Sequence, residues 1–252
     1  MKALVMLSVV LVMLAIGGCV PLPPGVEDII SEVSTQVSVT GSGNVITKDL
    51  DLSGFDQVEV SGAFIAEITQ GDDFSVVIRL DEKLEEHLRV QVIGGTLEVG
   101  LAPSLSILGT ATREVEITMP ELTRLELSGA SQGTLSGFES TGDLNVEVSG
   151  ASQLHGDIKA GDARFEVSGA GIVELSGSGG AIVLNASGAS TADLSDLAVQ
   201  DANVEATGAS TARVNASGRL DAEASGASRI LYLGSPTLGR VETSGASTIE
   251  GG

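Results

Sequence analysis

Residues 144–180 read LNVEVSGASQLHGDIKAGDARFEVSGAGIVELSGSGG, and they contain two copies of a motif that recurs through the second half of the chain. The tetrapeptide Ser-Gly-Ala-Ser, or a near variant, returns at spacings of 21, 19, 19, 20, 18 and 19 residues. Its copies begin at Ser128, Ser149, Ser168, Ser187, Thr207, Ser225 and Ser244. Such regular self-similarity is the signature of a repeat architecture in which each unit stacks on the next.

Apolar residues precede each copy at fixed places. The columns one and three residues before the motif are apolar in nearly every repeat, and a second alternating stretch follows the motif. Apolar positions separated by one residue are typical of a strand with one buried face. Each repeat therefore predicts two short strands that meet at Gly-Ala. Stacked repeats predict an all-β fold, a parallel β-helix (solenoid) with rungs of about 19 residues. An antiparallel sandwich is the alternative, although its strands would not share a fixed register with identical corners.

The composition excludes several classes of protein. The 252 residues carry a formal charge of −21, which gives no attraction for phosphates, so we expect no nucleic acid partner. An apolar content of 42% can bury a core, which excludes a disordered chain. The single cysteine excludes an intrachain disulfide framework and a thiolate metal cluster.

The N-terminus has the features of an export signal. Lys2 precedes an apolar run over residues 3–16, which is short for a membrane span but suits a signal peptide. The run leads to Ile-Gly-Gly-Cys19, which resembles the lipobox of bacterial lipoproteins, where the cysteine thiol receives a lipid. We expect residues 1–18 to be a lipoprotein signal peptide, Cys19 to be lipidated and residues 19–40 to form the tether. Val20 then favours the outer membrane, if the organism has one. The alternative is a generic secretory signal with an incidental cysteine.

A column of carboxylates stands two residues before the motif copies. Because it lies between two inward columns, it is expected to face outward and to stack at the strand spacing of about 4.8 Å. Like charges at that distance repel by about 1 kcal/mol in water, and Arg124, Arg164 and Arg240 on the same face are expected to offset this repulsion. A solubilising face is one interpretation. The other is a set of oxygen ligands for Ca²⁺ or a cationic partner, and its residues are Glu126, Glu147, Glu166, Glu205, Glu223 and Glu242.

The recurring serines are better explained by structure than by catalysis. Short hydroxyl side chains satisfy backbone groups at bends, whereas a nucleophilic serine needs a base. The chain has only two histidines, His87 and His155, and His155 has no acidic companion at a telling spacing. We therefore expect hydroxyl ladders at the corners and no catalytic residues.

The pattern of residues 41–252 resembles a known bacterial family. The match runs from Gly41-Ser-Gly-Asn44 through Ile68-Thr-Gln-Gly-Asp72 and Met119-Pro-Glu-Leu122 to Tyr232-Leu-Gly-Ser-Pro236. These residues resemble the auto-transporter adhesin "head GIN" domain. The resemblance implies a right-handed β-helix, exported and often carried on lipoproteins, with a proposed adhesin role. Up to about residue 125 the repeat is looser, and we expect irregular first rungs that cap the solenoid.

Two classes of function stay open at this point. The first is a lipid-anchored adhesion, scaffold or interaction module at the cell envelope, with a surface protein or a glycan as partner. The second is a polysaccharide lyase or hydrolase, because parallel β-helices also support such enzymes. Its best candidates are Asp193 and Glu174 near Arg213, but few aromatic rings are free to stack on a sugar. We also expect the solenoid ends to dock on another copy, because open strand edges invite pairing.

Overall fold

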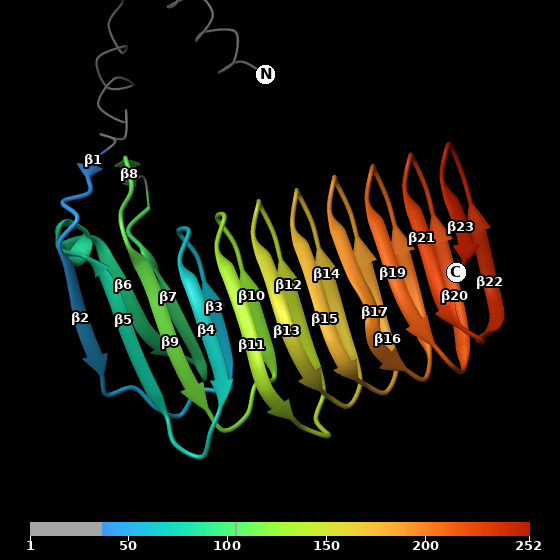
Figure 1. Ribbon diagram of the computed structural model, residues 1–252, viewed down its shortest axis with the longest axis horizontal. Helices are drawn as coiled ribbons and strands as arrows, with labels where there is room; N and C mark the ends of the chain where they lie inside the picture. The colour runs from blue at the N-terminus through green and yellow to red at the C-terminus, as the bar shows by residue number, and fades with distance from the viewer. Residues whose placement is uncertain (1–36, 104) are drawn as a thin grey trace, which may run out of the picture. The chain divides into compact units, whose positions relative to one another are not determined.

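The fold is built around two large β-sheets that face each other across a shared core, and a third sheet has only two strands (Figure 1). The computed structural model describes residues 37–103 and 105–252, within which the chain forms 23 strands and one short 3-10 helix. The predicted signal peptide, Cys19 and most of the predicted tether lie outside the described residues. The sheets form a β-solenoid with a spacing of about 20 residues between turns.

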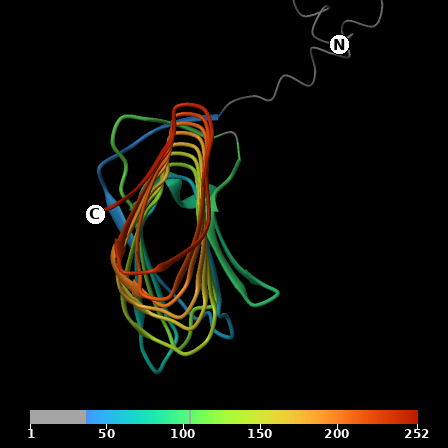
Figure 2. The same cartoon turned by 90° about the vertical axis from the view of Figure 1, so that its right-hand side faces the viewer.

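From residue 124 onward, every rung contributes one strand to each sheet, and all these strands pair in parallel. The ten-stranded sheet receives β10 (Arg124–Leu127), β12 (Leu144–Val148), β14 (Ala163–Val167), β16 (Ile182–Ala186), β18 (Ala202–Ala206), β20 (Arg219–Ala224) and β22 (Thr237–Thr243). The eleven-stranded sheet receives β11 (Gln132–Glu139), β13 (Gln153–Lys159), β15 (Ile172–Ser178), β17 (Thr191–Val199), β19 (Thr211–Ala216), β21 (Arg229–Gly234) and β23 (Thr248–Gly251). Figure 2 looks along the stack and shows these rungs superimposed.

The Gly-Ala corners lie one above the next. The backbone N–H of Ala170 donates to the Gly150 carbonyl at 2.7 Å, and Ala189 donates to Gly169 at the same distance. The corner glycines have φ between 64° and 78°, a left-handed conformation that glycine adopts without strain. The predicted parallel β-helix is therefore confirmed, and the antiparallel sandwich is excluded.

The corner serines form the predicted hydroxyl ladder. The hydroxyl of Ser228 shares its hydrogen between the carbonyls of Ala206 and Ser225, at 2.8 and 2.9 Å. Ser210 makes the same pair of contacts one rung earlier, and both serines are buried. The Ala206 carbonyl also accepts the Ser225 N–H at 2.9 Å, so the serine hydroxyl is a further link between each corner and the strand end of the rung before it.

The core consists of the inward columns of both sheets. In the ten-stranded sheet Leu125, Val146, Phe165, Leu184 and Val204 follow one another in register, each with no exposed surface. Each such side chain contributes about 1.5–3 kcal/mol by leaving water. A single rung could not bury this column alone, so the stacking of rungs supplies the stability.

The first part of the chain completes the stack in an order that differs from the sequence. β3 (Gln57–Val60) pairs with β10 on one side and with β7 (Thr96–Leu101) on the other. β4 (Ile65–Gln70) lies in the same way between β11 and β9 (Arg113–Met119). The early motif copy Ser61-Gly-Ala63 therefore belongs to an inner rung, and later residues lie outside it (Figure 1).

Antiparallel strands and the 3-10 helix form the entry end of the solenoid. β5 pairs antiparallel with both β2 and β9, and β6 pairs antiparallel with β7. These elements are β1 (Val37–Thr40), β2 (Val45–Leu50), β5 (Ser75–Asp81), η1 (Glu82–His87), β6 (Leu88–Ile93) and β8 (Leu105–Leu108). Leu84 on η1 is fully buried in the core.

The side chain of Asp81 links two segments of this end by hydrogen bonds. Its carboxylate is 1% exposed and accepts hydrogen bonds from the Ser42 N–H and hydroxyl at 2.7 and 2.9 Å, from the Gly43 N–H at 2.8 Å and from the Lys83 N–H at 3.1 Å. Burial acts to raise the pKa of Asp81, but these hydrogen bonds outweigh it and lower the pKa below its usual value. The carboxylate thereby joins the segment before β2 to the start of η1.

We predict that Asp81→Asn lowers the melting temperature at pH 7 by several degrees, because an amide nitrogen would then face N–H donors. Since the folded pKa lies below the unfolded one, the stabilising effect is complete above the unfolded value near 4. It is lost as the pH falls through the folded pKa. Thermal unfolding between pH 7 and pH 2 should show the difference shrinking at the acid end. The exposed Asp73→Asn serves as control, and equal melting temperatures for the two variants at pH 7 would contradict this role.

Candidate functional site

The outer face of the ten-stranded sheet carries the predicted carboxylates as one continuous file. The register of the strands places each predicted glutamate opposite the next, with Asn185 as the one interruption. The file also extends past Glu126 to Glu59 and then to Glu98 on β7. We call this set the acidic column: Glu98, Glu59, Glu126, Glu147, Glu166, Asn185, Glu205, Glu223 and Glu242.

Three arginines on the same face neutralise part of the acidic column, as expected. Arg124 lies 2.8 Å from Glu126 and 3.1 Å from Glu147, so one guanidinium bridges two rungs. Arg164 contacts Glu166 at 2.6 Å. A second bridge is formed by Arg240, which lies 2.7 Å from Glu242 and 3.1 Å from Glu223.

Within the acidic column, Glu59 has a pKa raised above its usual value. Partial burial raises its pKa, and the neighbouring carboxylates of Glu126 and Glu98 raise it further, whereas Arg124 opposes them. Within residues 37–103 and 105–252, no lysine or arginine lies within salt-bridge distance of Glu59 or Glu205. The column therefore keeps a net negative charge along much of its length.

The carboxylates of the acidic column lie along a line, one to each rung, and do not surround a common point. Among the described residues, no group of three or more His, Cys, Asp or Glu side chains is arranged to hold a metal ion. Ca²⁺ coordination needs six to eight oxygen ligands gathered around one point. Calcium binding stays a prediction, and the arrangement suits an extended cationic surface better than a single ion.

We predict that Arg124→Gln destabilises the protein by about 0.5–1 kcal/mol at low salt, because Glu126 and Glu147 lose their shared partner. The loss should shrink in 1 M NaCl, where the screening length falls to about 3 Å. Urea unfolding at both salt concentrations measures the effect. Arg89→Gln is the matched control, since Arg89 donates only to the carbonyls of Glu86 and Leu88. An Arg124→Gln effect that does not depend on salt would contradict the electrostatic role.

The outer face of the eleven-stranded sheet carries the residues considered for catalysis. His155, Glu174, Asp193 and Arg213 occupy successive rungs of one outward column. His155 Nδ1 lies 3.2 Å from Glu174, and Arg213 lies 2.7 Å from Asp193. The spacing of His155 and Glu174 in the sequence did not indicate that they form a pair.

Asp193 is poorly suited to act as a general acid. Burial acts to raise its pKa, but hydrogen bonds from Ser195 and Arg213 outweigh it and lower the pKa below its usual value. Few rings are available beside it, because Phe138 and Phe165 are buried and Tyr232 is half-buried. A sugar-cleaving site usually combines a carboxylic acid of raised pKa with a platform for the substrate. This column shows neither feature.

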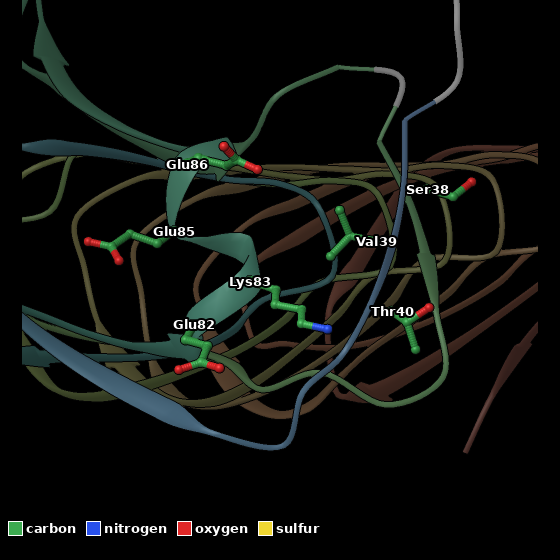
Figure 3. Close-up of a pocket in the computed structure, with 7 residues that line it drawn as sticks. All are labelled: Ser38, Val39, Thr40, Glu82, Lys83, Glu85 and Glu86. Atoms are coloured by element: carbon green, nitrogen blue, oxygen red, sulfur yellow. The ribbon is translucent and has the colours of Figure 1, made fainter.

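An open hollow lies at the entry end, between β1 and η1 (Figure 3). Its volume is about 730 Å³. Ser38, Val39 and Thr40 line one side, and four charged residues of η1 line the other: Glu82, Lys83, Glu85 and Glu86. Glu85 is paired with Lys48 at 2.6 Å. The hollow is polar and broad, and its side chains do not converge on one point (Figure 3).

Comparison with known proteins places the chain in a family. The family described as "Putative auto-transporter adhesin, head GIN domain" matches residues 54–236, well over half of the chain. The chain belongs to the head GIN domain family. The resemblance drawn from the sequence motifs is thereby confirmed. No match was found among curated proteins.

Solved structures share the fold of this head GIN domain. A putative adhesin from Bacteroides fragilis superposes with a TM-score of 0.80 at 21% identity, covering 84% of this chain and 99% of its own. A putative lipid binding protein from Parabacteroides distasonis gives 0.68 at 20% identity, covering 85% and 99%. A putative adhesin from the same organism gives 0.65 at 16% identity, with the same coverage. These neighbours show the fold, and the description of the family fits an adhesion or interaction role.

Proposed function

We propose that this head GIN domain is a lipid-anchored, extracytoplasmic β-solenoid that acts as an adhesion or interaction module at the bacterial cell envelope. Membership of an adhesin-like family carries the proposal, and the regular outward columns support it. They offer an extended surface, repeated rung by rung, instead of a pocket in which catalytic groups meet. Repeat proteins commonly use such extended surfaces to bind partners.

The proposed anchor is a lipid on Cys19. No helix of the described residues is long and apolar enough to span a bilayer. The apolar run over residues 3–16 and the lipobox-like Gly-Gly-Cys19 support export followed by lipidation. Several acyl chains would hold the mature protein firmly, because each buried CH₂ adds about 0.8 kcal/mol. Val20 supports the outer membrane as destination where there is one.

Cell fractionation tests the anchor. We expect the wild-type protein in the membrane fraction and, after detergent phase separation, in the detergent phase. Cys19→Ala should lose nearly all of this association, whereas Val20→Ala, the adjacent control, should keep it. Equal membrane retention of Cys19→Ala and the wild type would contradict lipid anchoring.

The proposed binding partner is a surface protein or a glycan that meets one outer face of the solenoid. Glycan arrays and pull-down from envelope extracts with residues 20–252 test this, with charge reversal at Glu147 and Glu166 as the variant. We expect capture that depends on the outer face and no turnover. A second experiment tests the enzyme alternative. The protein is incubated with acidic polysaccharides, and ultraviolet absorbance reports whether they are cleaved. Cleavage that is lost in Asp193→Asn would show an enzyme instead.

A further inference from the structure

A small hollow lies beside the start of β9, at the entry end of the eleven-stranded sheet (Figure 1). Its volume is about 320 Å³, and it shares no lining residue with the larger hollow beside η1. The corner before β4, the end of β5 and the segment that leads into β9 surround it. The residues that give it its chemical character are Ile65, Asp81, Thr110, Thr112, Arg113 and Glu114.

Arg113 stands at a position of β9 that faces the core. Val115 and Ile117, two and four residues further along the same face, are each 1% exposed, and the register partner Leu80 has no exposed surface. Nη1 of Arg113 donates to the Gly62 carbonyl at 3.3 Å, but Nε is buried and has no hydrogen-bond partner among the described residues. Burial lowers the pKa of Arg113 from its usual value, because the guanidinium has lost part of its hydration.

No carboxylate of residues 37–103 or 105–252 compensates Arg113 for this loss of hydration. Although the chain carries −21, Arg113 and Arg89 are the two arginines that form no salt bridge within these residues, and Arg89 is exposed to water. A charge that leaves water without a partner costs free energy, so buried charges in proteins are normally paired. An anion bound in the hollow would supply the partner that Arg113 lacks.

The other residues of the hollow restrict the kind of anion. Asp81 and Glu114 bring two carboxylates to the lining, and these would repel a phosphate or a polyanion more strongly than a singly charged group. Thr110 and Thr112, which also line the hollow, carry hydroxyl groups. Glu114 is 43% exposed, so its carboxylate can accept hydrogen bonds from hydroxyl groups of a ligand. A ligand with one carboxylate and several hydroxyl groups therefore fits this lining.

We propose that this hollow binds one acidic sugar residue of a glycan, with the Arg113 guanidinium donating to its carboxylate and with its hydroxyl groups bonded by Glu114 and Thr112. Hydrogen bonds between a guanidinium and a carboxylate are among the strong ones in proteins. Ile65, 47% exposed, offers an apolar surface to the C–H groups of the sugar ring. The volume lies at the lower end of the range for small-molecule pockets, about 300–1,000 Å³, which suits a single residue. The proposal rests on the proposed function and specifies the class of glycan as one that carries isolated acidic residues.

NMR titration of residues 20–252, labelled with ¹⁵N, tests the proposal with D-glucuronate, D-glucose, acetate and inorganic sulfate as probes. Residues 38–252 form one compact unit with its own core, so this chain is expected to fold. We expect saturable shifts of the amide signals of residues 110–114 with glucuronate, and binding at least 10-fold weaker for glucose, which lacks the carboxylate. Acetate and sulfate should also bind more weakly than glucuronate.

Variants assign the binding to the hollow. Arg113→Gln should lower the affinity for glucuronate at least 10-fold, whereas Arg89→Gln, the matched control at an exposed arginine, should leave it unchanged. Thr112→Val removes a hydroxyl group at nearly constant size and should lower the affinity about 3-fold. This second variant keeps the test decisive if Arg113→Gln does not fold.

The absence of saturable shifts with glucuronate would overturn the proposal, as would shifts that are unchanged in both Arg113→Gln and Thr112→Val. Acetate that binds as tightly as glucuronate would overturn the assignment to a sugar, and sulfate that binds more tightly would overturn the choice of a carboxylate. Failure here is distinguishable from failure of the proposed function. An empty hollow leaves the Cys19-dependent membrane association and capture by the outer faces intact, whereas a soluble location in cells leaves glucuronate binding in solution intact.

Discussion

Gly188→Ala is expected to destabilise the solenoid by about 3 kcal/mol or more. Gly188 has φ +75°, and a left-handed conformation costs a non-glycine residue about 1–2 kcal/mol. In addition, a Cβ on Gly188 would lie 2.7 Å from the Gly169 carbonyl oxygen and 3.1 Å from its nitrogen, atoms of the corner below. The rungs would have to separate at that corner, and the hydrogen bond from Ala189 to Gly169 would lengthen.

Gly137→Ala separates the two contributions. Gly137 has nearly the same φ, +74°, but a Cβ there would meet no atom within 4 Å. This control should therefore lose only the conformational part, about 1–2 kcal/mol. Urea unfolding of both variants measures the difference. If they were equally stable, the corners would not be packed one on another.

Phe165→Ala is expected to cost about 3–5 kcal/mol, the range for truncating a buried aromatic side chain. Phe165 is fully buried, and its register partners Val146 and Leu184 are smaller, so neither can fill the space. Phe165→Leu should lose much less, because it keeps most of the apolar contact. Ile65→Ala is the surface control, since Ile65 is 47% exposed and should cost well under 1 kcal/mol.

Hydrogen exchange locates the effect of Phe165→Ala. Because each rung contacts only its neighbours, protection should fall first in β12, β14 and β16 and should persist longer in distant rungs. A loss of protection spread evenly from β3 to β23 would contradict a core built rung by rung.

The regular half of the fold could be predicted from the sequence because its determinants are local. The alternation before Ser149 fixes an inward and an outward face, and the Gly-Ala pair after it fixes a corner. Repetition at a constant interval then sets the register between rungs. The stacking of Glu147 on Glu166 could therefore be predicted from the sequence alone. The pairing of Arg124 with its neighbours followed from the same argument.

The first half could not be predicted in the same way, because its order in space departs from its order in the chain. Nothing near Ser61 shows that its rung lies between β9 and β11, since that pairing depends on residues about fifty positions later. The place of Glu98 in the acidic column could not be predicted from the sequence either, because no Ser-Gly-Ala corner follows it. Three of the four hydrogen bonds to Asp81 also come from distant residues, about forty positions earlier in the chain.

The candidate site shows the same division. The outward columns follow from strand periodicity, so their membership could be predicted from the sequence. The pairing of His155 with Glu174 depends on side-chain conformations in adjacent rungs, and the periodicity does not determine these.

Distances between spin labels on one outward column test the stacked order itself. Cys19 is the only cysteine, so residues 20–252 can be labelled at chosen pairs of sites. Glu250 lies six, seven and eight rungs from Thr134, Glu67 and Glu116 along one column. At about 4.8 Å per rung, the expected separations are about 29, 34 and 38 Å. A Glu116 label nearer to Glu250 than the Glu67 label, as chain order alone would give, would contradict the solenoid described here.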